Sequence, residues 1–269
     1  MEKLSLEQIK QVEVDILKNF DAFCRQNNIR YFLSNGTLLG AAKYKGFIPW
    51  DDDIDVCLPR EDYDRFIAEY PPSGKYELLC SERNSGYIFP YAKLSDTSTV
   101  IKNQVSLKNY TYGVHVDIFP LDYWNDDLQI AKKQIKKLEG IANNLIMSIA
   151  SFSLGRTFLR TCAKTVWCAA AHIKGHKRIS TELNDEIIKT KNNSGERYCG
   201  CIVWPIHGEG EILPADIFGE TVYLEFEGGE YPAPMEYDAY LKNLYGEWSK
   251  ELPQKKQRSH HKFNAYKIS

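Results

Sequence analysis

The chain has 269 residues, of which 43% are hydrophobic and 26% are charged, and its formal net charge is −2. This composition is ordinary for a soluble globular protein, and the length suits one large domain or a domain with a sizeable insertion. A nearly neutral chain without a recognised nucleic-acid motif is not expected to bind nucleic acid, and seven scattered cysteines without a C-x-x-C pair indicate a reducing compartment.

The N-terminal segment predicts an amphipathic helix. Ser5 and Gln8 fit a capping box, and apolar residues then recur at three- and four-residue steps as far as Phe23. Residues 1–15 are charged and contain no apolar run of the signal-peptide kind, so we expect no signal peptide. The longest uncharged run, residues 141–155, is too short and too polar to span a bilayer.

A short strand is predicted over residues 29–33 (IRYFL), followed by a tight turn with a glycine and then by LLGAAK, a good helix former. A strand, a glycine turn and a helix start direct backbone N–H groups toward a phosphate. We therefore predict that the four turn residues bind substrate; they are Ser34, Asn35, Gly36 and Thr37.

An acidic run then leads directly into an apolar strand pattern, with aspartates at positions 51, 52, 53 and 55. Alternate residues of a strand share a face, so Asp51, Asp53 and Asp55 should point one way. Carboxylates at this density need solvation, protonation or a hard cation, and oxygen ligands suit Mg²⁺ or Mn²⁺. An EF-hand loop does not fit, because the sixth position counted from Asp51 is Val56 and not glycine. An acidic surface strand is the other alternative.

Residues 59–70 predict a second helix, with a proline and acidic residues in its first turn. Three short strands are expected next, over residues 76–80, 87–94 and 98–102. Residues 113–119 (GVHVDIF) alternate cleanly and place His115 and Asp117 on one face of a strand. Asp117 is therefore a candidate third metal ligand, or the acceptor of a proton from an attacking hydroxyl. The alternative is an aspartate at the rim of the sheet.

The middle of the chain, residues 126–192, predicts helices with a basic character. Residues 128–178 hold ten Lys and Arg against one acidic residue, Glu139, which indicates a basic face for an anionic partner. A helical subdomain packed on the core and an amphipathic helix at a membrane surface are both compatible with this pattern. Short strands follow over residues 195–226, and a last helix should end at Gly246.

Two strings, residues 34–42 (SNGTLLGAA) and 46–56 (GFIPWDDDIDV), strongly resemble the LicD family. Its members include bacterial phosphocholine transferases and the animal fukutin-related proteins. Further matches lie at residues 113–120 (GVHVDIFP), 226–229 (FEGG) and 237–246 (YDAYLKNLYG), so the resemblance covers most of the chain.

The resemblance implies an α+β fold, with a nucleotidyltransferase-like mixed β-sheet core flanked by helices and a helical basic insertion. We expect residues 1–125 to form the catalytic core and residues 126–194 to form the helical basic subdomain. Residues 195–269 are expected to be a C-terminal segment that completes the core.

The predicted metal ligands and catalytic residues are Asp53, Asp55 and Asp117, which would hold Mg²⁺ or Mn²⁺ against the phosphates of a nucleotide-linked substrate. The alternate spacing alone does not show whether Asp51 is a metal ligand or an acid that lies behind the ligands.

Three further residues are predicted to bind substrate. Lys93 follows a predicted strand and is a candidate phosphate cation, with a solvated lysine as the alternative. A quaternary ammonium cannot donate hydrogen bonds and favours aromatic faces. We select Trp50 and Tyr91 for this contact because both lie close to the motifs.

The resemblance implies a phosphotransferase that passes phosphocholine from CDP-choline to a sugar hydroxyl and releases CMP. The acceptor would be a lipid-linked glycan, such as a teichoic-acid precursor or lipopolysaccharide, so we expect a cytoplasmic enzyme at the inner membrane face. One alternative is a nucleotidyltransferase that adds a nucleoside monophosphate to a sugar or antibiotic hydroxyl and releases pyrophosphate. Another is a non-catalytic choline or sugar binder that keeps the fold.

Overall fold

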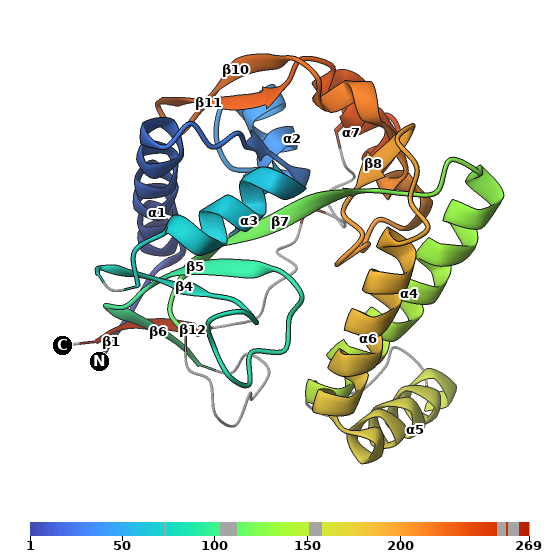
Figure 1. Ribbon diagram of the computed structural model, residues 1–269. Helices are drawn as coiled ribbons and strands as arrows, with labels where there is room; N and C mark the ends of the chain where they lie inside the picture. The colour runs from blue at the N-terminus through green and yellow to red at the C-terminus, as the bar shows by residue number, and fades with distance from the viewer. Residues whose placement is uncertain (73, 103–111, 151–157, 252–256, 258–263, 269) are drawn as a thin grey trace.

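The computed structural model describes residues 1–72, 74–102, 112–150, 158–251, 257 and 264–268. Its central sheet contains β2 (Phe32–Leu33), β3 (Ile54–Pro59), β4 (Tyr76–Leu79), β5 (Ala92–Asp96), β7 (His115–Tyr123), β8 (Tyr198–Gly200) and β9 (Leu213–Pro214). The strand order is β2-β3-β7-β5-β4, and β8 and β9 extend the sheet from β7 (Figure 1). Strands β3 and β7 are parallel, whereas the other paired strands of this sheet are antiparallel.

Helices flank this sheet and bury its apolar residues. They are α1 (Leu6–Gln26), α2 (Asn35–Tyr44), α3 (Arg60–Glu69), α4 (Leu128–Ile149), α5 (Phe158–Lys174), α6 (His176–Lys191) and α7 (Tyr237–Tyr245), with short 3-10 turns η1 (Gly208–Glu211) and η2 (Ala215–Phe218). Helix α1 packs on β5 and β7, and α3 packs on β3 and β7. Helix α4 packs on both α5 and α6, and the three form a group beside the sheet (Figure 1). The predicted α+β class is confirmed.

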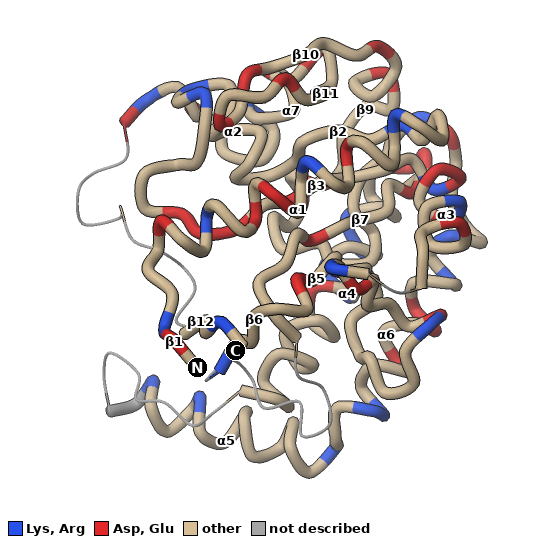
Figure 2. The backbone as a smooth tube through the Cα atoms, turned by 90° about the vertical axis from the view of Figure 1, so that its left-hand side faces the viewer, with Lys and Arg blue, Asp and Glu red and all other residues tan. Residues whose placement is uncertain are grey.

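Two smaller sheets complete the described fold. Strands β1 (Glu2–Lys3), β12 (Asn264–Lys267) and β6 (Thr99–Lys102) form an antiparallel sheet in the order β1-β12-β6. This sheet brings the two chain ends together, as Figure 2 shows. Strands β10 (Thr221–Phe226) and β11 (Gly229–Pro234) form a hairpin, and β10 packs on α2.

Several local predictions are confirmed. The Ser5 hydroxyl accepts a hydrogen bond from the Gln8 N–H at 3.2 Å, and the Gln8 side chain accepts one from the Ser5 N–H at 2.8 Å, so the capping box starts α1 as expected. Helix α3 occupies the predicted segment, and α7 ends at Gly246, which has a positive φ of 69°.

Other local predictions were wrong. The acidic run is not a strand before Ile54, because the Asp51 N–H donates to the Ile48 carbonyl at 2.9 Å and closes a turn with Pro49 at its second position. Of the three aspartates expected to share one face of a strand, only Asp55 lies in β3. Residues 34–37 are not a free turn, since α2 already begins at Asn35. Of the predicted strand over residues 87–94, only residues 92–94 form a strand, as part of β5.

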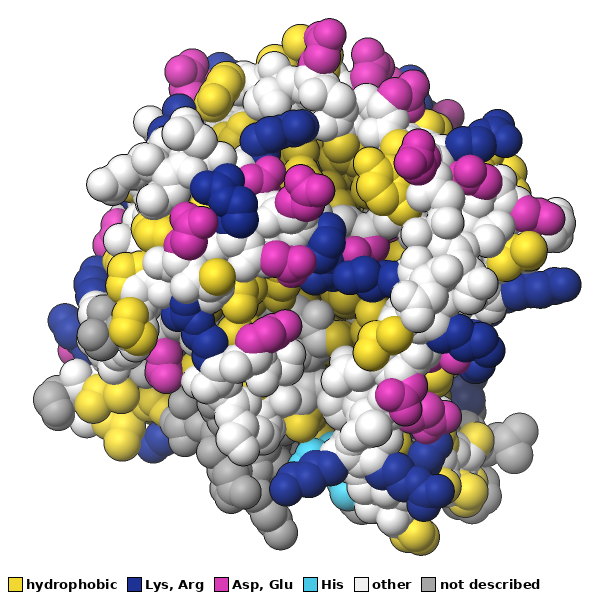
Figure 3. Space-filling view, viewed as in Figure 1, with side chains coloured by type: hydrophobic (Ala, Val, Ile, Leu, Met, Phe, Trp, Pro, Cys, Tyr) yellow, Lys and Arg dark blue, Asp and Glu magenta, His cyan; other side chains and the backbone are white. Residues whose placement is uncertain are grey.

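Part of the positive charge of the middle segment is paired within the molecule. Lys132 and Lys136 of α4 both contact Glu209, at 2.8 and 3.1 Å, and Lys137 contacts Glu186 of α6 at 2.5 Å. Other Lys and Arg side chains remain at the surface over α4–α6, toward the lower right of Figure 3. Among the helices of the described ranges, none has the length and apolar character that a bilayer crossing requires.

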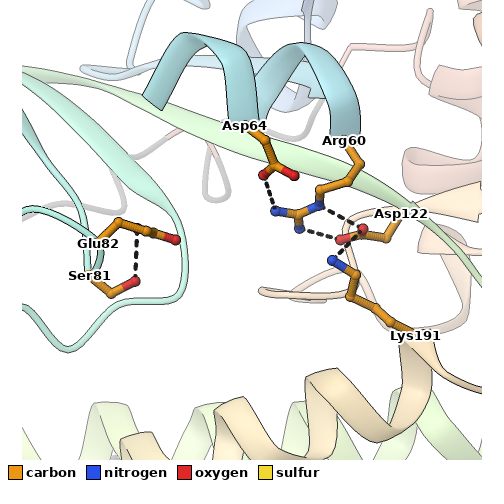
Figure 4. Close-up of polar contacts among 6 residues, drawn as sticks. All are labelled: Arg60, Asp64, Ser81, Glu82, Asp122 and Lys191. Carbon is orange, nitrogen blue, oxygen red and sulfur yellow. Dashed lines mark hydrogen bonds and ion pairs between the residues drawn. The ribbon is translucent and has the colours of Figure 1, made fainter. Parts of the chain in front are cut away.

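An ion network around the buried Asp122 carboxylate joins α3, the central sheet and α6 (Figure 4). Arg60 binds both carboxylate oxygens of Asp122, at 2.8 and 2.5 Å, and contacts Asp64 at 3.2 Å. Lys191, in the last turn of α6, lies 3.3 Å from the same Asp122 carboxylate. The Asp122 side chain is 3% exposed, whereas that of Asp64 is 63% exposed. A buried carboxylate with two cations is costly to disrupt, because removing it leaves the cations without their partner.

We expect Asp122→Asn to lower the free energy of unfolding by about 3 kcal/mol or more, the usual cost of breaking a buried ion pair. The matched control is Asp64→Asn, which removes the exposed partner of the same arginine and should cost less than about 1 kcal/mol. Urea denaturation measures both changes. An equal loss of unfolding free energy in the two variants would contradict the conclusion that the Asp122 ion pair contributes more to stability than the exposed Asp64 pair.

Candidate active site

Three neighbouring strands place three of the predicted site residues in one row. Asp55 on β3 lies directly across from Asp117 on β7 in the parallel register. Asp117 lies directly across from Lys93 on β5 in the antiparallel register. The Lys93 ammonium contacts Asp117 Oδ1 at 2.5 Å. The sheet thus brings together two carboxylates and one cation that are far apart in the sequence.

The backbone of Asp55 is fixed by the start of α2. Its N–H donates to Thr37 Oγ1 at 2.8 Å, and its carbonyl accepts from the Ser34 N–H at 3.1 Å. Its carboxylate accepts from the Asn35 side-chain amide at 3.2 Å. Thr37 and Ser34 are both buried, so water does not compete for these contacts. Three of the four predicted turn residues, Ser34, Asn35 and Thr37, therefore position Asp55.

Asn35 has a left-handed backbone conformation, with φ of 48°, which asparagine tolerates better than most residues. Tyr240 of α7 stabilises this conformation: its hydroxyl accepts from the Asn35 N–H and donates to the Asn35 side-chain oxygen, each at 3.3 Å. A residue near the C-terminus thereby orients the amide that contacts Asp55.

Lys93 and His115 form a buried pair beside Asp117. His115 Nδ1 lies 3.0 Å from the Gly113 carbonyl, which can only accept, so Nδ1 carries the proton. His115 Nε2 then accepts from the Lys93 ammonium at 3.0 Å. Lys93 is 5% exposed, and the ring centroids of Tyr91 and Tyr112 lie 5.1 and 5.9 Å from its ammonium. Lys93 is therefore a buried counter-ion of Asp117. The alternative of a solvated lysine does not apply, because the side chain is buried.

A pocket of about 350 Å³ opens beside this row. Its acidic wall consists of Asp51, Asp53 and Asp55, and Gly36 lies next to them at the start of α2. A side chain at Gly36 would meet the Asp51 carboxylate at 2.9 Å, so the glycine makes room for this acid. Lys43 also lines the pocket. The acids and the helix start thus face a single space.

The aromatic residues that we selected for a quaternary ammonium lie in different places. Trp50 lines the pocket, together with Tyr245 and Trp248. Tyr91 does not line it in the described structure; its ring packs at 4.6 Å from that of Phe119 and lies under the Lys93 ammonium. The structure therefore brings Trp50 together with the acidic wall and places Tyr91 in the core.

Burial shifts the pKa of two groups next to the acidic wall. It raises the pKa of Tyr245 well above its usual value, and the Asp55 carboxylate adds to this effect. It also raises the pKa of Glu211 to about 8, although the backbone N–H groups of His207 and Cys201 partly offset the shift. Both groups favour the neutral form, so little further negative charge enters the site.

The donor set fits a hard divalent cation in its chemistry. Asp53, Asp55 and Asp117 supply carboxylate oxygens, the donors that Mg²⁺ and Mn²⁺ prefer, and the register places Asp55 and Asp117 on adjacent strands. Within the part of the chain that the structure describes, no three His, Cys, Asp or Glu side chains already form a metal-binding group. Asp117 Oδ1 is instead held by Lys93.

Several pocket residues come from the C-terminal part of the chain and were not predicted as site residues. They are Ile206, His207, Tyr245, Glu247, Trp248 and Lys250. No local pattern in the sequence gives them this role, because the packing of α7 on α2 and of η1 on α7 brings these segments to the acidic wall. The resemblance at residues 237–246 was the available signal for the α7 part.

The comparisons with known proteins agree with this site. The family description "LicD/FKTN/FKRP, nucleotidyltransferase domain" matches residues 28–144, the part that contains Asp55, Lys93 and Asp117. "Ribitol 5-phosphate transferase FKRP" of Homo sapiens is 34% identical over 92 residues, which are 34% of this chain and 17% of that protein. The same protein of Mus musculus gives the same identity and coverage.

A second similarity covers the whole chain. "Lipopolysaccharide cholinephosphotransferase LicD" of Haemophilus influenzae is 30% identical over an alignment of 273 positions that covers 99% of each protein. The resemblance read from the motifs is thereby confirmed, and the chain belongs to the LicD family.

Proposed function

We propose that this protein transfers phosphocholine from CDP-choline to a sugar hydroxyl of a cell-surface glycan and releases CMP, with the help of Mg²⁺ or Mn²⁺. The observation that carries the proposal is the row Asp55–Asp117–Lys93 beside the start of α2 and an aromatic pocket. The similarity to a cholinephosphotransferase over 99% of both chains supports the choice of head group.

Three carboxylates of the site would hold the donor's phosphates through a cation. Asp53, Asp55 and Asp117 would bind a divalent ion, which when present neutralises phosphate charge. Gly36 and Thr37 lie in the first turn of α2, where backbone N–H groups have no intrahelical acceptor and favour an anion. Lys93 would orient the Asp117 carboxylate through its 2.5 Å contact.

In this reaction the acceptor hydroxyl oxygen forms a bond to the phosphorus that carries choline, and the bond from that phosphorus to CMP breaks. The hydroxyl proton passes to a carboxylate of the acidic wall. His115 is not the acceptor of this proton in the described arrangement, because its Nε2 lone pair faces Lys93.

The aromatic side of the pocket would receive the choline head group. Trp50, Tyr245 and Trp248 line one space, and a trimethylammonium group binds such faces by cation–π contact. Glu247 lies in the same lining and would add a negative charge. A ribitol head group would gain little from these rings, so the pocket favours choline.

The proposal is tested by incubating the protein with CDP-choline and a lipid-linked glycan extract, with Mg²⁺ or EDTA, and measuring CMP and pyrophosphate. We expect CMP release that requires the metal and falls about 100-fold or more in Asp55→Asn, because a direct ligand should matter at least as much as the groups that orient ligands. The control is Asp15→Asn, an acid outside the site.

Other products would support other functions. Pyrophosphate from a nucleoside triphosphate, with no CMP from CDP-choline, would identify a nucleotidyltransferase. Donor binding without turnover, equal in the wild type and Asp55→Asn, would identify a non-catalytic binder. CMP release from CDP-ribitol but not from CDP-choline would overturn the choice of head group.

We also propose that the enzyme works at the inner face of the cell membrane, where lipid-linked teichoic-acid precursors or other glycolipids are made. Helix α5 supports this location: Val166, Trp167 and Ile173 are 69%, 43% and 88% exposed, and Arg160 and Lys164 lie on the same helix. Apolar and basic side chains together suit an anionic lipid surface. Arg156, which precedes α5 in the chain, lies outside the described residues.

We expect the double change Val166→Ser and Ile173→Ser to weaken binding to vesicles that contain phosphatidylglycerol by about tenfold or more, since each apolar side chain loses its burial in lipid. CDP-choline turnover without lipid should not change. The matched control is Ile188→Ser on α6, which is 57% exposed. Co-sedimentation measures the binding, and equal binding by all three proteins would contradict the role of α5.

A further inference from the structure

Glu13 is a buried acid on a helix that otherwise presents apolar residues to the sheet. Ile9, Ile16 and Leu17 of α1 are buried, and Glu13 lies among them at the same helical spacing. Its side chain is 2% exposed. An acid at such a position is costly unless a partner offsets the loss of water.

The described structure gives Glu13 little of that compensation. Glu13 Oε2 is buried and has no hydrogen-bond partner among the described residues. The positive charge that favours its ionised form is Lys10, whose ammonium lies over the Phe47 ring at 4.8 Å. Burial and nearby acids therefore raise the pKa of Glu13 well above its usual value.

Those nearby acids are the residues of the candidate active site. In order of effect they are Asp53, Asp52 and Asp117. Asp53 lines the pocket, and Asp117 lies on β7, one of the two strands that α1 covers. Glu13 thus lies on the buried side of α1, which packs on the strand of Asp117. Its Oε2 has no hydrogen-bond partner among the described residues, and two of the acids that act on it are predicted metal ligands.

We propose that Glu13 is a further carboxylate of the divalent-metal site, which binds the ion or a water molecule of the ion. This inference rests on the proposed metal-dependent function. A cation among Glu13, Asp53 and Asp117 would replace repulsion by attraction and would give Oε2 the partner that the described residues do not provide. Glu13 lies outside residues 28–144, so the match to the family description does not include it.

The alternative is a neutral carboxyl group that fills space under α1. The two roles differ in their response to metal. A metal-site carboxylate changes the affinity for the ion and contributes little to the fold of the metal-free protein, whereas a space-filling group affects the fold and leaves the affinity for the ion unchanged.

The test measures Mn²⁺ binding by isothermal titration calorimetry and thermal unfolding in EDTA for the wild type and Glu13→Gln. We expect Mn²⁺ affinity to fall roughly 10- to 100-fold in Glu13→Gln, as for groups next to a metal, with a folded protein in EDTA. The matched control is Glu7→Gln, the same change at an exposed position of the same helix, which should bind Mn²⁺ as the wild type does.

Asp55→Asn separates this inference from the proposed function. If Asp55→Asn loses Mn²⁺ while Glu13→Gln binds it as the wild type does, the role of Glu13 is overturned and the metal site stands. If the wild type binds no Mn²⁺, both are overturned. If Glu13→Gln does not fold, Glu13→Met repeats the test, because methionine has a similar length and suits the apolar face. Failure of both variants to fold in EDTA would identify Glu13 as a structural residue and overturn the proposal.

Discussion

The candidate active site depends on the hydrogen bonds by which α2 holds the backbone of Asp55. Thr37 accepts from its N–H and Ser34 donates to its carbonyl, so β3 cannot slide relative to the helix without breaking two buried contacts. Because β3 is in register with β7, the same contacts also fix where Asp55 stands relative to Asp117. The antiparallel pairing of β5 with β7 then fixes the position of Lys93 relative to Asp117. The row of three charged residues therefore depends on the position of Asp55.

This arrangement concentrates negative charge beside the pocket. Asp53 and Asp117 act electrostatically on Glu13, and Asp55 acts on both Tyr245 and Glu211. The protein offsets part of this repulsion with Lys93, which contacts Asp117. A fold optimised for stability alone would not collect so many carboxylates, and such local conflicts are common at sites that bind a ligand. A bound cation with nucleotide phosphates would explain the collection.

The sequence predicted the features that depend on neighbours in the chain. The capping box of α1, the span of α3 and the end of α7 at Gly246 follow from local patterns, and the motif strings led to the correct family and fold class. Features that depend on packing were out of reach. No pattern predicts that Lys93 is in register with Asp117 or that Tyr240 contacts Asn35. The strand boundary was misplaced because a turn that contains Pro49 outweighs the alternation of the aspartates.

The most direct test of this account is a crystal structure of the protein soaked with Mn²⁺ and CDP-choline, with anomalous scattering used to locate the manganese. The account predicts an anomalous peak within coordination distance of Asp55 and Asp117, with the donor's phosphates at the start of α2 and the choline next to Trp50. Manganese at any other position, or a donor bound away from the acidic wall, would contradict it.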